Sequence, residues 1–219
     1  MARKKKVLRS STHFTIHENK DRNDLVGLGG TDAMKIVEGK WKELFELKLG
    51  KREFPNLDNV LPVQMGLHTE EMNRIWFMKQ TGLTVLKPDI ITSNEVPFLY
   101  ASVDGITEDG CIFEAKHVSP FTVKDVVEKY YPQIQHYLMV TRFEKAYLSV
   151  FVGNSMHKIF EIDRDDKFIF KLLYAESYFW NFVETNIEPP DYVDFNSLTY
   201  GEQNEFTLPK PSWISETIH

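Results

Sequence analysis

The sequence predicts an α/β protein with a small mixed central β-sheet flanked by helices. Two short apolar runs joined by a turn at residues 107–110 predict a β-hairpin across residues 102–118. Residues 146–153 form a second β-rich run, in which Ala146, Leu148 and Val150 fall on one face. Segments with helical periodicity precede, separate and follow these strands, and therefore predict helices on the sheet.

The composition is that of a globular protein. The chain has 219 residues, of which 42% are hydrophobic, and it contains 16 Phe. We expect a single domain over residues 1–219, with residues 1–21 and about 196–219 peripheral. The one cysteine excludes a disulfide framework and a four-cysteine metal site within one chain. Since no apolar run approaches the roughly 20 residues of a membrane span and no signal segment follows the basic N-terminus, we expect no membrane contact and a cytoplasmic location.

The formal net charge of −6 argues by itself against nucleic acid as a partner. A nuclease, however, needs only a local basic track, and carboxylates that bind metal add negative charge that the ions later cancel. The basic run at residues 3–6 favours a solvated terminus over a phosphate contact.

The first half of the chain predicts three helices. We expect residues 1–24 to be irregular, and a glycine turn to lead into a helix within residues 25–39, with Thr31 or Asp32 as its N-cap. A second helix spans residues 40–51 and stops near Gly50. A connector with Pro and Asn leads to a third helix over residues 65–80, and residues 82–92 predict a strand with a turn.

The second half adds two further helices to the strands already named. One covers about residues 123–141 and is interrupted by a proline. The other covers residues 168–185 and is stopped by the following IEPP. Its many aromatic residues are spaced as in a helix that packs in a core, so we expect it to cover the sheet rather than to stack on bases. The tail after about residue 196 is polar.

Three charges inside the hairpin need an explanation, because a charge in a strand is costly unless it is paired or binds a metal. The side-chain period of two places Glu114 and Lys116 on one face, and the hairpin returns Asp104 to their side. Carboxylates at this density suit Mg²⁺. Lys116 would then position the attacking water or neutralise charge on a phosphate. The alternative is an exposed hairpin whose charges pair across the strands in water.

Neighbouring segments offer further polar groups. Glu70 and Glu71 lie at the expected start of the helix over residues 65–80, where one of them could reach the metal site and the other complement the helix dipole. Downstream, Gln133 and Gln135 lie on a helix that should pack beside the sheet, although a helical Gln is more often a surface residue.

Several motifs, taken together and in this order, resemble the YqaJ-like viral recombinases. They are GLGGTDA, GLHTE, SVDG, FEAK, YYPQIQHYLMVT and SYFWNFVE, within residues 22–190. This family includes the phage lambda-type alkaline exonuclease and belongs to the PD-(D/E)xK nuclease superfamily. The resemblance implies that fold, with Val103 in place of the usual proline before Asp104.

The resemblance also implies roles for individual residues. The metal ligands would be Asp104, Glu114, the backbone carbonyl of Ala115, and Glu70 rather than Glu71. Lys116 would be the catalytic lysine. Gln133 would lie beside the metals.

A glycine turn with an upstream arginine holds a 5′-phosphate in this family. The corresponding DNA-binding candidates here are Arg22, Thr31, Gln135 and Lys124, of which Lys124 is out of register. His68 matches no ligand at this spacing and is expected on a helix surface.

By this resemblance the chain is a 5′-to-3′ exonuclease that degrades one strand of linear double-stranded DNA in phage-type homologous recombination. It would use two Mg²⁺ ions, with Mn²⁺ as a substitute. The implied assembly is a ring-shaped homotrimer, the implied partner is a single-strand annealing protein, and the implied location is the cytoplasm of a bacterial host. Two alternatives stay open, namely an endonuclease of the same fold, of restriction or repair type, and a catalytically inactive DNA-binding relative.

Overall fold

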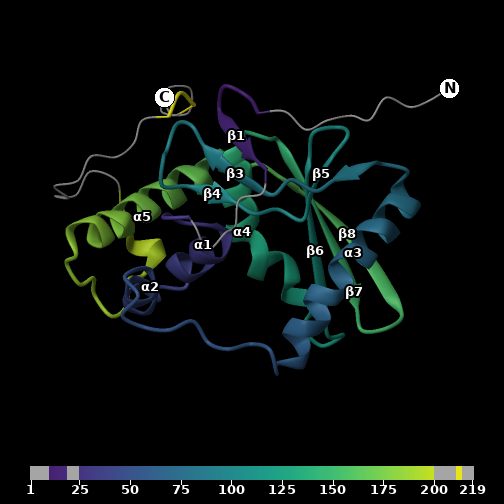
Figure 1. The fold of residues 1–219 in the computed structure, drawn as a ribbon, viewed down its shortest axis with the longest axis horizontal. Coiled ribbons are helices and arrows are strands. Elements are labelled where there is room, and N and C mark those ends of the chain that lie inside the picture. The colour runs from purple at the N-terminus through teal and green to yellow at the C-terminus, as the bar shows by residue number, and fades with distance from the viewer. Residues whose placement is uncertain (1–9, 19–24, 200–210, 214–219) are drawn as a thin grey trace.

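The computed structural model describes residues 10–18, 25–199 and 211–213. It confirms a mixed central sheet flanked by helices (Figure 1). In the described part of the chain, no helix combines the length and the apolar character that a membrane crossing requires. Arg22 lies outside the described residues.

The central sheet has five strands in the order β2-β5-β6-β7-β8. Their bounds are β2 Val85–Leu86, β5 Gly105–Thr107, β6 Ile112–Val118, β7 Lys145–Val152 and β8 Met156–Asp163. Only β6 and β7 pair in parallel, and the other neighbours are antiparallel, so the sheet is mixed as predicted. The predicted hairpin is β5–β6, and its turn is closed by a bond from Gly110 N–H to the Thr107 carbonyl.

A second sheet of three short strands, in the order β1-β3-β4, lies beside the first. These strands are β1 Phe14–His17, β3 Ile90–Ser93 and β4 Tyr100–Ala101. The expectation that residues 1–24 are irregular is therefore wrong for β1, whose pairing with β3 joins residues far apart in sequence. Strand β8 was not predicted. It is an edge strand whose side chains are largely exposed, and buried and exposed positions do not alternate regularly along it.

Five α-helices of the described chain surround the sheets. They are α1 Gly30–Val37, α2 Trp41–Lys48, α3 Leu61–Thr81, α4 Val126–Thr141 and α5 Asp166–Thr185, with short 3₁₀ turns η2 Val123–Asp125 and η3 Phe195–Ser197. The predicted N-cap of α1 is wrong, because Gly29 is the N-cap and the Asp32 carboxylate accepts the Gly29 N–H at 2.8 Å from within the helix. Pro132 lies inside α4 without ending it.

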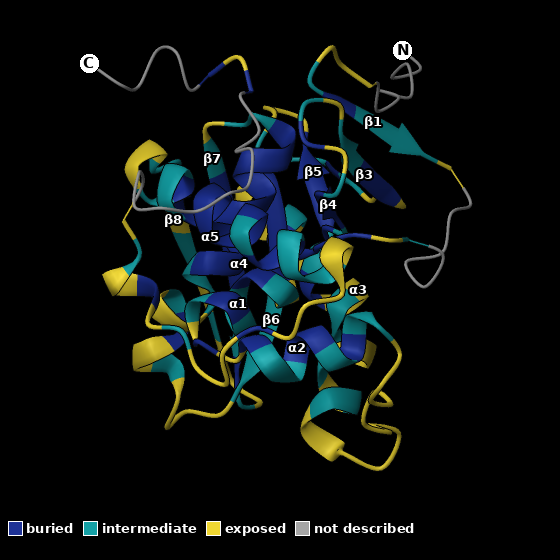
Figure 2. Ribbon diagram, turned by 90° about the vertical axis from the view of Figure 1, so that its left-hand side faces the viewer, coloured by how far each residue is buried: buried dark blue, intermediate teal, exposed yellow. Residues whose placement is uncertain are grey.

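Helix α4, and not the last helix, covers the main face of the sheet. It contacts β6 and β7 and is itself largely buried (Figure 2). Leu148 and Val150 of β7 are fully buried in the core. Helix α5 packs chiefly on α1, α2 and α4, which corrects the expectation that it covers the strands. Its aromatic side chains do belong to the core, as predicted: the Phe179 ring meets the Trp41 indole edge-on at 5.7 Å.

A buried ionic contact joins α4 to α5. His136 Nδ1 lies 2.8 Å from the Glu176 carboxylate, and His136 Nε2 lies 2.8 Å from the Tyr100 carbonyl. Both side chains are completely buried. Both ring nitrogens face oxygen atoms, and the Glu176 carboxylate outweighs burial and raises the pKa of His136, which favours an imidazolium paired with a carboxylate.

Helix α3 packs on the opposite face of the sheet from α4, against β6 and β7. Its contact rests on few buried groups, because only Asn73 and Phe77 are buried. The Phe77 ring lies 5.0 Å from the Phe113 ring. The helix begins at Leu61, four residues before the predicted start, so Glu70 lies in its middle and not in its first turn.

Candidate active site

The candidate site lies at the edge of β6, just beyond the point where β5, its partner in the hairpin, stops pairing with it. Strand β5 pairs with β6 only as far as Gly105 opposite Phe113. Beyond that point no described strand covers this edge of β6. Asp104, in the bend between β4 and β5, takes the place of the missing strand, and its Oδ2 accepts the Ala115 N–H at 2.8 Å. In a strand the N–H and C=O of one residue point to the same side, so the Ala115 carbonyl faces the same open edge.

Glu114 and Lys116 project from β6 toward α4, on one face as the strand period predicts. Lys116 Nζ donates to Glu114 Oε1 at 2.6 Å, and it also lies 4.7 Å from the centre of the Tyr130 ring of α4. Glu114 is only 2% exposed. The alternative of a hairpin with solvated charges is therefore excluded for this pair.

Burial perturbs every charge in this group. Burial, with the negative charge of Glu114, raises the pKa of Asp104 to about 8. Burial likewise raises the pKa of Glu114, although Lys116 acts in the opposite sense. For Lys116, burial lowers the pKa, but the carboxylates of Glu114 and Asp104 outweigh it and the pKa is raised overall. The single ammonium of Lys116 therefore does not balance the two buried carboxylates of Asp104 and Glu114.

Glu70 approaches the carboxylates from α3. Its negative charge raises the pKa of both Asp104 and Glu114, which places it within their electrostatic reach. Its own Oε1 accepts a hydrogen bond from Lys87, in the loop after β2. Glu71 is exposed, as is His68, which lies on the helix surface as expected.

The donor set suits a hard divalent cation. Glu114 Oε2 is buried and has no hydrogen-bond partner among the described residues, so one carboxylate oxygen is left for a ligand. One oxygen of each carboxylate is held: Glu114 Oε1 by Lys116, Glu70 Oε1 by Lys87 and Asp104 Oδ2 by the Ala115 N–H. Within residues 10–18, 25–199 and 211–213, no three His, Cys, Asp or Glu side chains already converge as a ligand group. Bound ions would therefore have to replace some of these contacts.

Gln133 is held beside this group by a chain of hydrogen bonds. Its Nε2 donates to the Tyr137 hydroxyl at 2.7 Å, and that hydroxyl donates to the Ser102 carbonyl at 3.0 Å, two residues before Asp104. The glycine turn lies against the same side chains, since a Cβ on Gly30 would come within 2.8 Å of Gln133 Cγ. The fold thus brings the buried Gly30, and with it the start of α1, next to Gln133, while the following Thr31 is exposed.

Two other predicted DNA contacts, Gln135 and Lys124, lie in α4 and in the preceding turn η2. Gln135 is completely buried, and its amide donates to the Asp163 carbonyl at 2.8 Å and accepts the Asp165 N–H at 2.9 Å. This corrects its expected role, because a helix turns by about 200° over two residues and carries Gln135 away from Gln133. Lys124 is exposed on η2.

Tyr137 and Lys87 bond to candidate site residues, Gln133 and Glu70, but neither was predicted from the sequence. Tyr137 follows Gln133 by four residues, so the helical spacing was the signal that would have found it. Lys87 offered no such signal, because its contact with Glu70 joins a loop to a helix.

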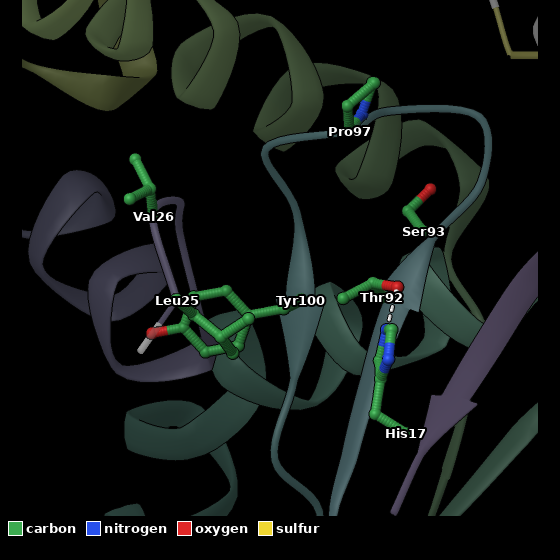
Figure 3. A pocket seen from close by; sticks show the side chains of 7 residues that line it. All are labelled: His17, Leu25, Val26, Thr92, Ser93, Pro97 and Tyr100. Atoms are coloured by element: carbon green, nitrogen blue, oxygen red, sulfur yellow. Dashed lines mark hydrogen bonds between the residues drawn. The ribbon is translucent and has the colours of Figure 1, made fainter. Parts of the chain in front are cut away.

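A cavity of about 420 Å³ lies at the small sheet, away from the carboxylates (Figure 3). The His17 imidazole and the Thr92 hydroxyl, 2.9 Å apart, form one wall, and the Tyr100 ring forms another. Tyr100 also packs on Gly29, where a Cβ would come within 2.8 Å of the ring. The cavity and the glycine turn therefore share this side chain.

The fold is that of the PD-(D/E)xK nucleases, and comparison with solved structures supports it. An alkaline exonuclease from Laribacter hongkongensis superposes with a TM-score of 0.64 at 19% identity, over 76% of this chain and 92% of that one. A phage-related exonuclease from Haemophilus somnus 129PT gives a TM-score of 0.55 at 15% identity, over 74% and 97% of the two chains.

Residues 19–144 match the YqaJ-like viral recombinase domain, and the chain belongs to that family. The uncharacterized protein YqaJ of Bacillus subtilis (strain 168) is 34% identical over 167 residues, which are 71% of this chain and 52% of that protein. The chain thus spans about half the length of this relative.

Proposed function

We propose that the chain is a metal-dependent deoxyribonuclease that degrades one strand of linear double-stranded DNA from the 5′ end. The observation that carries this proposal is the buried contact of Glu114 with Lys116 beside Asp104, at an edge of β6 that no strand of the described residues covers. Similarity to two structures named as exonucleases supports the nuclease class, and the Laribacter enzyme has also been solved in complex with dAMP.

The residues that would hold two divalent ions are Asp104, Glu114, Glu70 and the Ala115 carbonyl. Bound Mg²⁺, or Mn²⁺ in its place, would supply an activated water and stabilise the leaving oxygen. Lys116 has two N–H groups beyond the one given to Glu114, and these can orient that water or neutralise a phosphate oxygen. Gln133 would turn its carbonyl oxygen toward the metals, since its amide nitrogen is held by Tyr137.

The start of α1 is the candidate for binding the 5′-phosphate. It offers an exposed Thr31 and the first N–H groups of a helix next to Gln133, although the Gly29 N–H already donates to Asp32. Arg22 and Lys124 remain proposed as basic contacts. Such local contacts allow a chain of net charge −6 to bind DNA.

The family suggests the biological setting. We propose a homotrimer that encloses the DNA, a single-strand annealing protein as partner, phage-type recombination as the process, and the cytoplasm of a bacterial host as the place. Residues 1–219 would act as one nuclease domain.

Digestion of linear duplex DNA with Mg²⁺ tests the activity. One end should carry a 5′-phosphate and the other a 5′-hydroxyl, with a closed circle alongside. We expect stepwise loss of the 5′-phosphorylated strand, none in Lys116→Ala, and full activity in Lys129→Ala, whose ammonium lies over the same Tyr130 ring. Cleavage of the circle would indicate an endonuclease. No cleavage that depends on Lys116 would indicate an inactive DNA-binding relative.

A further inference from the structure

Helix α3 is fastened to the sheet by a polar contact one turn after Glu70. Asn73 is 1% exposed, and all its polar atoms are engaged. Its Nδ2 donates to the Ser149 carbonyl at 3.0 Å and to the Lys116 carbonyl at 3.3 Å, and its Oδ1 accepts the Ser149 hydroxyl at 2.6 Å. One side chain of α3 thus holds β6 at the catalytic lysine and β7 at Ser149.

The contact continues to β8. Ser149 Oγ lies 2.7 Å from His157 Nε2. Because the Ser149 proton is given to Asn73, His157 must donate from Nε2, which fixes its tautomer. A directed row of hydrogen bonds therefore runs from His157 through Ser149 to Asn73, under the strand that carries Glu114 and Lys116.

Little else holds this part of α3. Among its residues only Asn73 and Phe77 are buried, and Phe77 lies a further turn away from Glu70. On the other side of Glu70, Thr69 contacts His117 Nδ1 at 3.2 Å, but the Thr69 hydroxyl also bonds to the Met65 carbonyl at 2.6 Å. Glu70 itself bonds to Lys87, which lies on a loop and is half-exposed.

We propose that Asn73 is a positioning residue that sets Glu70 over the Asp104–Glu114 pair, an inference that rests on the proposed function. Asn73 follows Glu70 by three residues, which is about 4.5 Å along the helix axis. Because a helix moves nearly as a rigid body over this distance, a displacement of Asn73 displaces Glu70 by almost the same amount. Asn73 touches neither DNA nor metal in this role. It acts through Glu70.

A double-mutant cycle tests this. Asn73→Ala should slow cleavage of linear duplex about 10-fold or more at saturating DNA, within the range typical of groups that orient ligands, and leave the KM for DNA within about twofold. In a Glu70→Gln background the same change should alter the rate by less than about twofold. Ile169→Ala, a core change in α5, controls for lost stability and should leave the rate per folded molecule unchanged. An equal loss from Asn73→Ala in both backgrounds would overturn the proposal.

Mn²⁺ binding followed by calorimetry gives a second readout that needs no cleavage. Asn73→Ala should weaken binding about 10-fold with Glu70 present and leave it unchanged in Glu70→Gln. If the wild type binds Mn²⁺ but does not cut DNA, the proposed function fails while this cycle still decides the role of Asn73. If Asn73→Ala does not fold, Ser149→Ala removes the bonds of the hydroxyl to Asn73 Oδ1 and to His157 but keeps both bonds that Asn73 Nδ2 donates. It should show the same dependence on Glu70, and an effect independent of Glu70 would again overturn the proposal.

Discussion

Lys116 Nζ and Glu114 Oε1 lie 2.6 Å apart on one strand, with only Ala115 between the two residues and almost no solvent around the carboxylate. Removing the ammonium leaves a buried carboxylate without its counter-charge. We expect Lys116→Met to lower the free energy of unfolding by about 1–3 kcal/mol in the absence of metal. A second change, Glu114→Gln, should recover most of that loss.

Denaturant unfolding of the two single variants and the double variant checks this coupling. Lys129→Met serves as the control, because Lys129 also lies over the Tyr130 ring but is exposed. Additive effects of the Lys116 and Glu114 changes would show that the pair is not coupled.

The binding of divalent metal should depend on pH through Asp104. Burial and Glu114 raise its pKa to about 8, so below that pH the metal-free carboxyl holds a proton that an ion must displace. The apparent affinity for Mn²⁺ should therefore rise about tenfold per pH unit from pH 6 to pH 8 and level off above. Calorimetric titrations at several pH values measure this, and Asp104→Asn should bind far more weakly at all of them. An affinity that does not change with pH would contradict the assignment of Asp104 as a ligand.

The same raised pKa has a consequence for the stability of the metal-free chain. The folded form binds the Asp104 proton more tightly than the unfolded form, whose pKa is near 3.8. The Asp104 contribution to the free energy of unfolding should thus fall as the pH rises from about 4 to 8. In EDTA, Asp104→Asn should melt at a higher temperature than the wild type at pH 8, and the difference should vanish near pH 4. Melting curves at the two pH values provide the measurement.

The buried pair of His136 and Glu176 should dominate the stability of the α4–α5 contact. Glu176→Gln would leave a buried imidazolium without its carboxylate and should cost about 3–5 kcal/mol. Glu184→Gln, on the same helix, keeps an oxygen that can accept the partly buried bond from Trp180 and should cost far less. Thermal or denaturant unfolding compares the two, and equal losses would refute the ionic pair.

His136 also gives this contact a pH dependence. Burial lowers its pKa, but Glu176 outweighs burial, the Tyr100 carbonyl and Asp32 add to it, and the pKa is raised overall. The stabilisation from a raised histidine pKa is complete below the unfolded value of 6.5 and is lost as the pH rises through the folded value. His136→Gln should flatten the fall in stability above pH 6.5.

Two glycines give a matched test of the turn beside Gln133. A Cβ on Gly30 would lie 2.6 Å from the Tyr137 ring and 2.8 Å from Gln133 Cγ, so Gly30→Ala must displace one of them. We expect it to cost about 1–3 kcal/mol and to slow cleavage. Gly66 in α3 has open space around it, so Gly66→Ala should stabilise the chain by about 0.5–1 kcal/mol. Melting temperatures and cleavage rates of both variants provide the measurement. Similar effects at the two positions would contradict the expected clash at Gly30.

Local rules predicted the centre of the site well. The period of two put Glu114 and Lys116 on one face, and the turn ending at Gly110, whose φ is 85°, fixed the return of the chain to Asp104. Both depend only on neighbours in sequence. The N-cap of α1 was misplaced because glycine, with Asp32 reaching back, can replace a capping side chain.

Long-range packing explains what the sequence did not reveal. Gln133 and Gln135 look alike in the sequence, and only the position of α4 between the sheet and α5 directs one to the site and the other to Asp163. The contact of Lys87 with Glu70 and that of Asn73 with Ser149 join segments with no shared local pattern. Strand β1 is likewise defined by its pairing with β3.

The bare edge of β6 also bears on the solubility of the protein. An unpaired strand edge offers its N–H and C=O groups to a strand of another molecule and so invites aggregation. Here Asp104 occupies the Ala115 N–H, and the charges of Glu114 and Lys116 beside it make an incoming strand costly. The residues proposed for catalysis therefore also hinder the pairing of this edge with a strand of a second copy of the protein. Inactive variants that replace them with apolar side chains should lose this protection together with activity.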